Sequence, residues 1–361
     1  MYRIVLLTLL LVMLAAVPAA GQDTLEPWTC PDGFAGQTLN VFNWATYIGE
    51  DTIVNFEDLC GVSVTYDVYD ADGDMMNVIR QGNPGYDIVV PSDYAYPQMI
   101  EEELLIPLDT TQIPNIQNLQ PLFVEEIEAS EETYVLPYLL GTFGLGYSVE
   151  RVGEEITSWE QFFNYDGPVA WIDDPRTMLG VALVTLGLDP NSEDPAELEQ
   201  ARQYLLDHSD NVVAIPADDG QELLVRGEVD MVIEYNGDIY QIALDCECDE
   251  YAYVIPEEGS GFSSGFIGIP IDGQNPALAH VFLDYLLDPQ VAAEIANFTA
   301  YPTPNQAAID AGLIDEELLN SPAIYPPAEA TDNLYFVEPK EEATEELYGF
   351  IWDEIKINLS A

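Results

Sequence analysis

Strand-like and helix-like patterns alternate along the first third of the chain. Residues 39–42 (LNVF) predict a first strand, which ends in a polar turn that carries Trp44 and Tyr47. A helix is predicted over Asp51–Leu59, because its apolar positions recur on one face. Residues 86–90 (YDIVV) form the continuous apolar run that is typical of a buried parallel strand. This alternation predicts an α/β fold with right-handed parallel crossovers.

A second unit of strands and helices follows, and the chain then returns to the first. We predict a strand pair over Tyr138–Val149, strands at Val169–Ile172, Val229–Tyr235 and Tyr251–Ile255, and helices at Thr177–Leu186 and from Asp194. The strand Phe266–Pro270 is expected to rejoin the first sheet, with helices starting at Asn275 and Asp288 and a last helix over Glu341–Ile355. The two units are therefore interwoven.

The first 21 residues have the pattern of a secretory signal peptide. Arg3 supplies the charged start, residues 4–17 form an apolar segment, and small residues at 18–21 form a cleavage zone. The apolar segment is short for a bilayer span. We therefore expect a soluble protein that is periplasmic or extracellular. No cysteine lies at the cleavage zone, which argues against a lipid anchor.

Four cysteines, Cys30, Cys60, Cys246 and Cys248, are disulfide candidates because an exported chain meets an oxidising compartment. Three pairings are possible. We favour Cys30–Cys60, whereas Cys246 and Cys248 could pair with each other only as a tight ring. Only two histidines accompany them, so neither a zinc site nor Cys–His catalysis is expected. We expect no metal and no cofactor.

The charge balance is extreme, with 66 Asp plus Glu against 8 Lys plus Arg. This charge excludes nucleic acid and anionic membrane surfaces as partners, and it attracts cationic solutes. A solvated acidic surface suited to high salt explains most of the excess.

Aromatic and acidic residues gather where predicted strands end. The candidates for ligand binding are Trp44, Tyr47, Ser92, Asp93, Tyr94, Asp174, Tyr235 and Asp238. Ligands of open α/β sheets bind beyond the carboxyl ends of strands. Carboxylates accept hydrogen bonds from ammonium groups, and aromatic faces attract cations. The set therefore suits an organic ammonium. The alternatives are that the rings pack in the core and that each Asp caps a helix.

Two other acidic patterns could indicate a calcium site or a glycosidase. Residues 70–74 (DADGD) depart from the EF-hand spacing, so we interpret them as a turn and helix cap. Paired carboxylates also occur in glycosidases, but no general acid stands out here. A secreted hydrolase is therefore only a minor alternative.

The chain resembles the spermidine/putrescine-binding proteins of bacterial ABC transporters over nearly all of its mature length. The matching segments include VFNWATYI, YDIVVPSDY, WIDDPRTML, EYNGDIYQ and AYPTPNQAA, in the same order and spacing. The resemblance implies a two-lobe periplasmic-binding-protein fold of the α/β class, each lobe a mostly parallel sheet flanked by helices, with hinge crossovers. Lobe 1 would comprise 37–136 plus about 262–300, and lobe 2 would comprise 137–261 plus about 301–361.

The resemblance also implies a function. It predicts a monomeric, non-catalytic binding protein that holds a polyamine between the lobes and delivers it to the membrane permease of an ABC importer. It places all eight candidates above at or beside the ligand, with Tyr235 where the family usually has Trp.

Several positions depart from the family. The family often has Glu where this chain has Thr177, Asp where it has Gly265 and an acid where it has Thr46. Some members have Trp at the position of Ser263, and a late Gln is replaced near Val337. Glu234 or Asp173 could compensate for the lost acids. The alternative ligand is therefore another small organic cation or a zwitterion.

The charge excess yields a testable prediction about salt. Some 58 uncompensated negative charges repel one another within one folded chain. In molar NaCl the Debye length is only about 3 Å, so this repulsion is screened. We expect the melting temperature to rise substantially between low and molar NaCl. A flat response would remove the high-salt explanation of the acidity.

Overall fold

The computed structural model describes residues 26–217, 219–246, 248–327, 333–340 and 342–359. The predicted signal peptide lies outside the described residues. Across the residues that are described, no helix combines the length and apolar character needed to cross a membrane.

The strands of these residues form one ten-stranded sheet. Its order is β2-β1-β3-β9-β4-β7-β5-β6, with β10 paired to β9 and β8 paired to β4. The strands are β1 (Thr38–Trp44), β2 (Ser63–Tyr69), β3 (Ile88–Val89), β4 (Val135–Ser148), β5 (Val169–Ala170), β6 (Val212–Ala214), β7 (Met231–Tyr235), β8 (Tyr251–Val254), β9 (Ser260–Gly268) and β10 (Leu334–Phe336).

Helices cover both ends of this sheet. They are α1 (Thr52–Cys60), α2 (Asp72–Arg80), α3 (Ala95–Glu101), α4 (Pro121–Ala129), α5 (Val149–Val152), α6 (Trp159–Phe163), α7 (Pro175–Thr185), α8 (Pro195–Asp207), α9 (Gly220–Arg226), α10 (Asn236–Cys246), α11 (Pro276–Leu286), α12 (Pro289–Thr299), α13 (Gln306–Asp310), α14 (Glu316–Leu319) and α16 (Glu342–Leu359). Two 3-10 turns, Thr110–Gln112 and Pro114–Asn118, precede α4.

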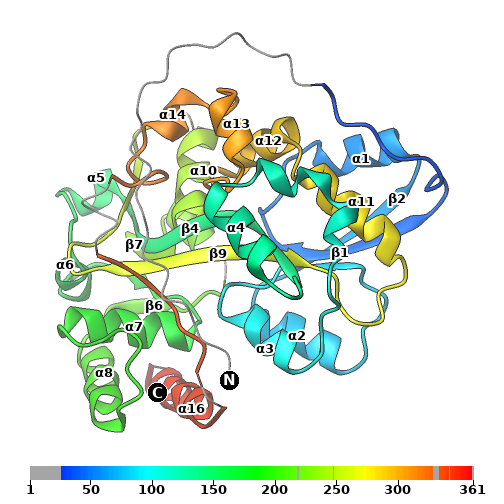
Figure 1. Ribbon diagram of the computed structural model, residues 1–361. Coiled ribbons are helices and arrows are strands. Elements are labelled where there is room, and N and C mark those ends of the chain that lie inside the picture. Colours follow the sequence, from blue (N-terminus) through cyan, green and yellow to red (C-terminus); the bar gives the residue numbers. More distant parts are fainter. Residues whose placement is uncertain (1–25, 218, 247, 328–332, 341, 360–361) are drawn as a thin grey trace.

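Strands β4 and β9 join the two halves of the molecule. They run antiparallel, side by side, across its middle (Figure 1). The first half contains β1 to β3, and the second half contains β5 to β8. The outer pairs β1–β2, β1–β3, β5–β6 and β5–β7 are parallel, as predicted. The predicted strand pair over Tyr138–Val149 is wrong, because β4 is one continuous strand.

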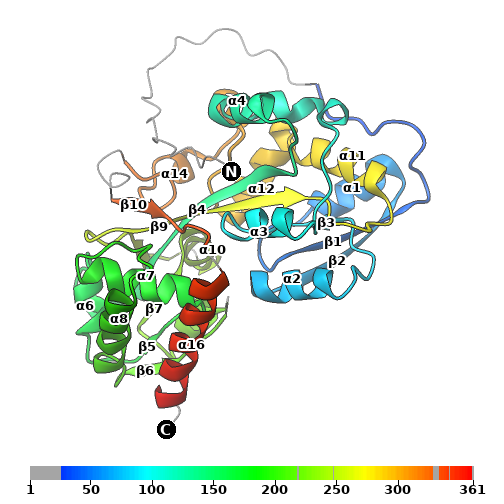
Figure 2. The same cartoon turned by 60° about the horizontal axis from the view of Figure 1, so that its bottom comes forward.

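Each half has its own hydrophobic core. The first core packs β1, β3 and β9 against α1, α11 and α12, with Phe56 and Phe282 fully buried. The second core packs β4, β5 and β7 against α6, α7, α8 and α16. Trp171 and Trp352 stack in it at 6.2 Å between ring centroids. The C-terminal helix α16 lies beside α7 and α8 (Figure 2). The segment with α13 and α14 packs against α12 instead.

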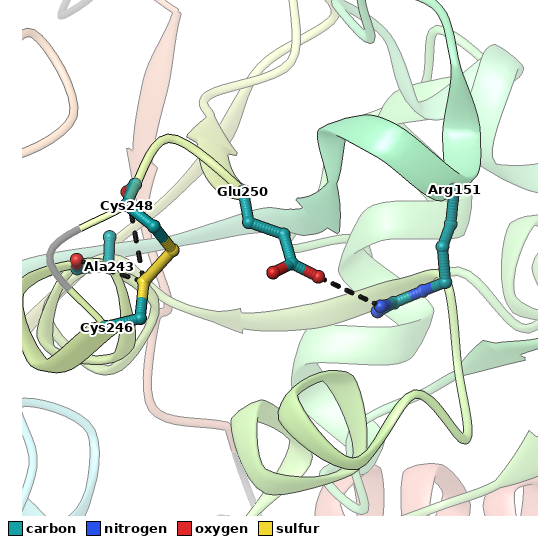
Figure 3. The surroundings of a disulfide bond; sticks show 5 residues. All are labelled: Arg151, Ala243, Cys246, Cys248 and Glu250. Carbon is teal, nitrogen blue, oxygen red and sulfur yellow. Dashed lines mark hydrogen bonds and ion pairs between the residues drawn. A yellow bond between two sulfur atoms is a disulfide. The ribbon is translucent and has the colours of Figure 1, made fainter.

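The four cysteines form two disulfides, one across 30 residues and one across two. Cys30 pairs with Cys60, which fastens the segment before β1 to the end of α1, as predicted. Cys246 pairs with Cys248 at the end of α10, with 5.2 Å between their Cα atoms. Figure 3 shows this bridge beside Glu250, which forms an ion pair with Arg151 at 3.4 Å. A Cys-X-Cys ring is therefore built despite its small size.

Glycines in β4 let neighbouring segments approach closely. A Cβ at Gly144 would lie 2.4 Å from the Val254 carbonyl oxygen and 2.7 Å from the Tyr253 hydroxyl oxygen. We expect Gly144→Ala to destabilise the fold by about 1–3 kcal/mol, because β8 must shift. Gly349→Ala is the matched control, since a Cβ there meets nothing within 4 Å. Gly349→Ala should raise the free energy of unfolding by about 0.5–1 kcal/mol, because alanine favours the helix more than glycine does. Urea denaturation measures the stability of both variants. Equal changes in stability would contradict the close packing of β8 against Gly144.

Candidate functional site

The turn after β1 places its two aromatic residues differently. The Trp44 indole Nε1 donates a hydrogen bond to the Val90 carbonyl oxygen at 2.8 Å, and its ring packs against Tyr69 at 4.7 Å. The Tyr47 ring instead meets the edges of Tyr138 and Tyr301, at 5.6 and 4.9 Å. Both rings are partly exposed. Trp44 is therefore fastened to the chain just after β3, and Tyr47 lies between segments from different parts of the chain.

The Tyr47 ring occupies the space beside Gly265. A Cβ at Gly265 would lie 2.7 Å from the Tyr47 hydroxyl oxygen and 2.8 Å from its Cε1. A larger side chain at 265 therefore requires Tyr47 to move. The Tyr47 phenol ring thus fills the space that a side chain at position 265 would need.

Asp238 joins the two halves of the molecule. It lies in the first turn of α10, is 4% exposed, and accepts hydrogen bonds from the Thr46 hydroxyl at 2.9 Å and the Tyr301 hydroxyl at 2.5 Å. Burial raises the pKa of Asp238, and these two hydrogen bonds lower it. Thr46 has φ 50°, a left-handed conformation unusual for a β-branched residue. The turn is therefore held in a strained shape at the contact with Asp238.

Ser92 is also bound to a buried carboxylate. Asp72, 2% exposed, accepts hydrogen bonds from the Ser92 hydroxyl at 2.5 Å and the Ser92 backbone N–H at 3.1 Å. Burial raises the pKa of Asp72, whereas hydrogen bonds from Ser92 and the Tyr94 side chain lower it. Ser92 in turn bridges to Gly265 of β9. The end of β3 and the start of α2 thus form one polar unit next to β9.

Tyr94 contacts the second half of the molecule through the guanidinium of Arg176. The Arg176 guanidinium carbon lies 4.2 Å from the Tyr94 ring centroid, and the guanidinium also forms a bidentate ion pair with Glu345 of α16. Burial raises the pKa of the Tyr94 hydroxyl. The nearby Asp72, Asp174 and Tyr235 side chains raise it further. Asp174 caps α7, because its carboxylate accepts the Thr177 N–H at 2.6 Å.

Glu234 and Asp173, the residues that could compensate for lost acids, have other partners. Asp173 accepts hydrogen bonds from Trp352 at 2.6 Å and Lys356 at 3.0 Å, both on α16. Glu234 is buried, and its two oxygens accept the backbone N–H groups of Gly220 and Tyr235. Burial holds the pKa of Glu234 well above its usual range, and the Asp238 charge adds to this rise.

Asp93 has an incompletely satisfied carboxylate. Its Oδ1 accepts the Tyr94 backbone N–H at 2.9 Å, whereas its Oδ2 is buried and has no hydrogen-bond partner among the described residues. Burial raises the pKa of Asp93 to about 8, and the nearby Asp72 charge adds to the rise.

Three residues at the site were missed by sequence reasoning. Asp72 was interpreted as part of a turn, although it lies three residues after the end of β2, which could have marked it. Arg176 escaped because the search was for acids and rings, although it follows the acidic pair at 173–174. Tyr301 lies within a segment quoted for the resemblance, but nothing in the sequence linked it to Asp238.

The site is built from oxygen acceptors, aromatic rings and one guanidinium. Within the described ranges, no group of three or more His, Cys, Asp or Glu side chains lies in a metal-binding arrangement. Such a set of groups can hold a small molecule that carries N–H donors and positive charge.

The raised pKa of Asp93 predicts a pH dependence of stability. Its pKa is about 8 in the folded chain and about 3.9 in an unfolded one. The folded state therefore binds more protons between these values, so stability falls as pH rises from about 4 to about 8. We expect Asp93→Asn to remove this fall, so that its advantage over the natural chain grows with pH.

Urea denaturation at pH 5 and pH 8 measures this change. Asp58→Asn, at an exposed position of α1, removes the same charge and is the control. A constant difference between Asp93→Asn and the natural chain at both pH values would contradict the prediction.

Comparisons with known proteins identify the family of the chain. The family described as bacterial extracellular solute-binding protein matches residues 51–324. Putrescine-binding periplasmic protein SpuD of Pseudomonas aeruginosa is 31% identical over 339 residues, which cover 89% of this chain and 92% of that protein. A solved spermidine/putrescine ABC transporter substrate-binding protein, PotD from Streptococcus pneumoniae, has a TM-score of 0.75 and 29% identity, covering 90% of this chain and 100% of that one.

A second solved structure, from Listeria monocytogenes and provisionally assigned to a spermidine/putrescine ABC transporter, has a TM-score of 0.82 and 32% identity. It covers 89% of this chain and 99% of that one. The match to the family spans most of the chain, and the solved relatives share its fold, which confirms the predicted periplasmic-binding-protein architecture. The chain belongs to the bacterial extracellular solute-binding proteins.

Proposed function

We propose that this protein is the extracytoplasmic substrate-binding component of an ABC importer, and that it binds a polyamine of the putrescine or spermidine kind. One observation carries the proposal: the two halves meet at Asp238, where a buried carboxylate of the second half accepts a hydrogen bond from Thr46 of the first. A cation held there contacts both halves at once. The names of the relatives supply the ligand class and the ABC transporter, and we propose its membrane permease as the partner.

The remaining candidates support an ammonium ligand. We assign ligand contacts to Trp44, Tyr47, Ser92, Asp93, Tyr94, Asp174, Tyr235 and Asp238. Tyr94 and Tyr235 come from opposite halves and interact electrostatically. Aromatic faces attract ammonium groups, and carboxylates neutralise them. The protein contributes binding and delivery in this scheme, with no chemical step.

We also propose how the chain is divided and where it acts. Lobe 1 would correspond to the first core and lobe 2 to the second, with β4 and β9 as the hinge crossovers. The C-terminal helix α16 supports this division, because it belongs to the second core. Export by the predicted signal peptide and a monomeric state complete the proposal.

A zwitterionic solute is the second candidate. Arg176 brings a positive charge to Tyr94, and Gly265 has no acid to offer. A ligand that carries both an ammonium and a carboxylate could use both charges. Against it, Arg176 already pairs with Glu345. The acidic surroundings thus favour the polyamine.

Asp238 provides the direct test. Asp238→Asn keeps the shape and removes the charge. A hydrogen bond to a charged group contributes about 1.5–3 kcal/mol, and a tenfold change in affinity is about 1.4 kcal/mol. We expect isothermal titration to show that the variant binds putrescine about 10- to 100-fold more weakly, while the unliganded melting temperature changes little.

Asp58→Asn is again the matched control and should bind like the natural chain. Titration of both proteins with a panel of diamines and amino acids separates the two candidate ligands. Binding of an amino acid without any diamine would replace the polyamine assignment. If Asp238→Asn alters only stability, Asp238 is a helix-terminal acid without a binding role.

A further inference from the structure

The two disulfides of the chain lie in different surroundings. Cys30–Cys60 spans 30 residues, Cys60 is 7% exposed, and both cysteines pack in the first core. Cys246–Cys248 spans only two residues, and Cys246 is exposed at the end of α10. A disulfide stabilises a fold chiefly by closing a loop of the unfolded chain, and this effect grows with loop length. Cys246–Cys248 therefore contributes far less to the stability of the fold than Cys30–Cys60 does.

The backbone holds Cys246 and Cys248 close together without the bridge. The Cys248 backbone N–H donates a hydrogen bond to the Ala243 carbonyl oxygen at 3.4 Å, a pattern that ends many helices. Two residues further on, the Glu250 side chain pairs with Arg151 at 3.4 Å (Figure 3), and β8 then pairs with β4. Because these contacts do not need the S–S bond, the two cysteines stay in place to pair again after reduction.

The end of α10 also accommodates the reduced form. The Cys246 Sγ lies 3.3 Å from the Ala243 carbonyl oxygen, next to the bridge in Figure 3. A reduced Cys246 carries a thiol proton, which it can donate to this oxygen, and a carbonyl oxygen has two lone pairs to accept with. The oxidised and the reduced states thus both fit the same backbone.

We propose that Cys246–Cys248 is a reversible thiol–disulfide exchange site that oxidises dithiols. A thiolate of the dithiol attacks the exposed Cys246 Sγ, a mixed disulfide forms, and the bond to the Cys248 Sγ breaks. The Cys248 sulfur leaves with the electron pair of that bond and takes a proton from water. The second thiolate of the dithiol then attacks the dithiol's own sulfur in the mixed disulfide, which releases a cyclic disulfide and Cys246, which is protonated in turn.

This exchange is balanced without another reactant. The dithiol loses two electrons and two protons, and the two cysteines gain them. All four cysteines of the chain are bridged, so no thiol of the chain itself starts the reaction. The activity goes beyond the proposed binding function and does not depend on it.

The surroundings of the bridge select the charge of the dithiol. Residues 245–250 have the sequence DCECDE, and Asp245 and Asp249 are exposed next to the cysteines. The whole chain carries a formal net charge of −58. Such a field slows the encounter with a thiol that carries additional negative charge, and salt screens this effect. Neutral and cationic dithiols are therefore the preferred substrates.

Differential reduction tests the exchange site. The natural chain is incubated without denaturant with dithiothreitol, a neutral dithiol, thiols are alkylated at intervals, and mass spectrometry of the peptides follows each bridge. We expect Cys246–Cys248 to be reduced at least about 100-fold faster than Cys30–Cys60, because its sulfur is exposed. It should form again when the disulfide of 2-mercaptoethanol replaces dithiothreitol. Equal rates for the two bridges, or failure of Cys246–Cys248 to form again, would overturn the inference.

Two monothiols test the selection by charge. The reacting thiolate of cysteamine is a zwitterion without net charge, whereas that of 2-mercaptoethanesulfonate carries two negative charges. After correction for the thiolate fraction of each compound, we expect cysteamine to attack Cys246–Cys248 at least about tenfold faster at low salt, and this ratio to fall several-fold in molar NaCl. A ratio that salt leaves unchanged would contradict the selection by charge.

A double variant separates this role from a structural one. Cys246→Ser combined with Cys248→Ser should change the melting temperature little, because the closed loop is short, whereas the matched pair Cys30→Ser and Cys60→Ser should lower it clearly. A larger loss in the first variant would show a structural bridge and overturn the inference. Its putrescine binding should equal that of the natural chain, because Asp238 lies at the opposite end of α10. Failure of the exchange site is thus distinguishable from failure of the binding function.

Discussion

The burial of the Asp238 carboxylate is the constraint on which the site depends. A buried charge is costly unless hydrogen bonds satisfy it. Here hydroxyls from two distant segments do so, Thr46 of the turn after β1 and Tyr301 after α12. Satisfying one acid therefore fixes the β1 turn, the start of α10 and the chain at 301 relative to one another. The left-handed Thr46 belongs to the same arrangement.

The shared sheet makes this contact possible. Because β4 and β9 run through both halves, the ends of β1, β3 and β7 come close to one another without a separate interface. The exposed acids elsewhere have a different role. Most described Arg and Lys side chains form ion pairs with them, for example Arg80 with Glu102 and Arg202 with Glu199. Such exposed pairs contribute little stability, so the acidic surface bears on solubility and salt response more than on the fold.

Much of the fold could be predicted, because apolar periodicity marks what is buried. The run at 86–90 predicted a buried strand, of which Ile88–Val89 pairs as β3, and the face at 51–59 predicted α1. The strand pair predicted over Tyr138–Val149 was wrong, because the glycines there lie within one continuous strand, β4. They are places where Tyr253 and Ile239 approach the strand closely. The periodicity of apolar residues indicates which positions are buried. It does not indicate where a neighbouring segment lies so close that only glycine fits.

The site was less predictable, because its partners are distant in sequence. The strand ends at 44–47, 92–94 and 235–238 could be found, since acids and rings follow apolar runs. Ser92 donates a hydrogen bond to Asp72 across 20 positions, and Tyr301 donates one to Asp238 across 63 positions. These partners are set by tertiary contacts that the sequence pattern does not indicate. The family resemblance predicts an acid that this chain lacks at 265, but nothing in the sequence indicated that the Tyr47 ring packs against Gly265.

The central claim is that a polyamine binds between the two halves and holds them together. Small-angle X-ray scattering with and without putrescine tests it most directly, because hinge closure around a ligand makes a two-lobe protein more compact. The account predicts that the radius of gyration falls when putrescine is added in excess. An unchanged radius of gyration, in a sample where calorimetry shows that putrescine is bound, would contradict it.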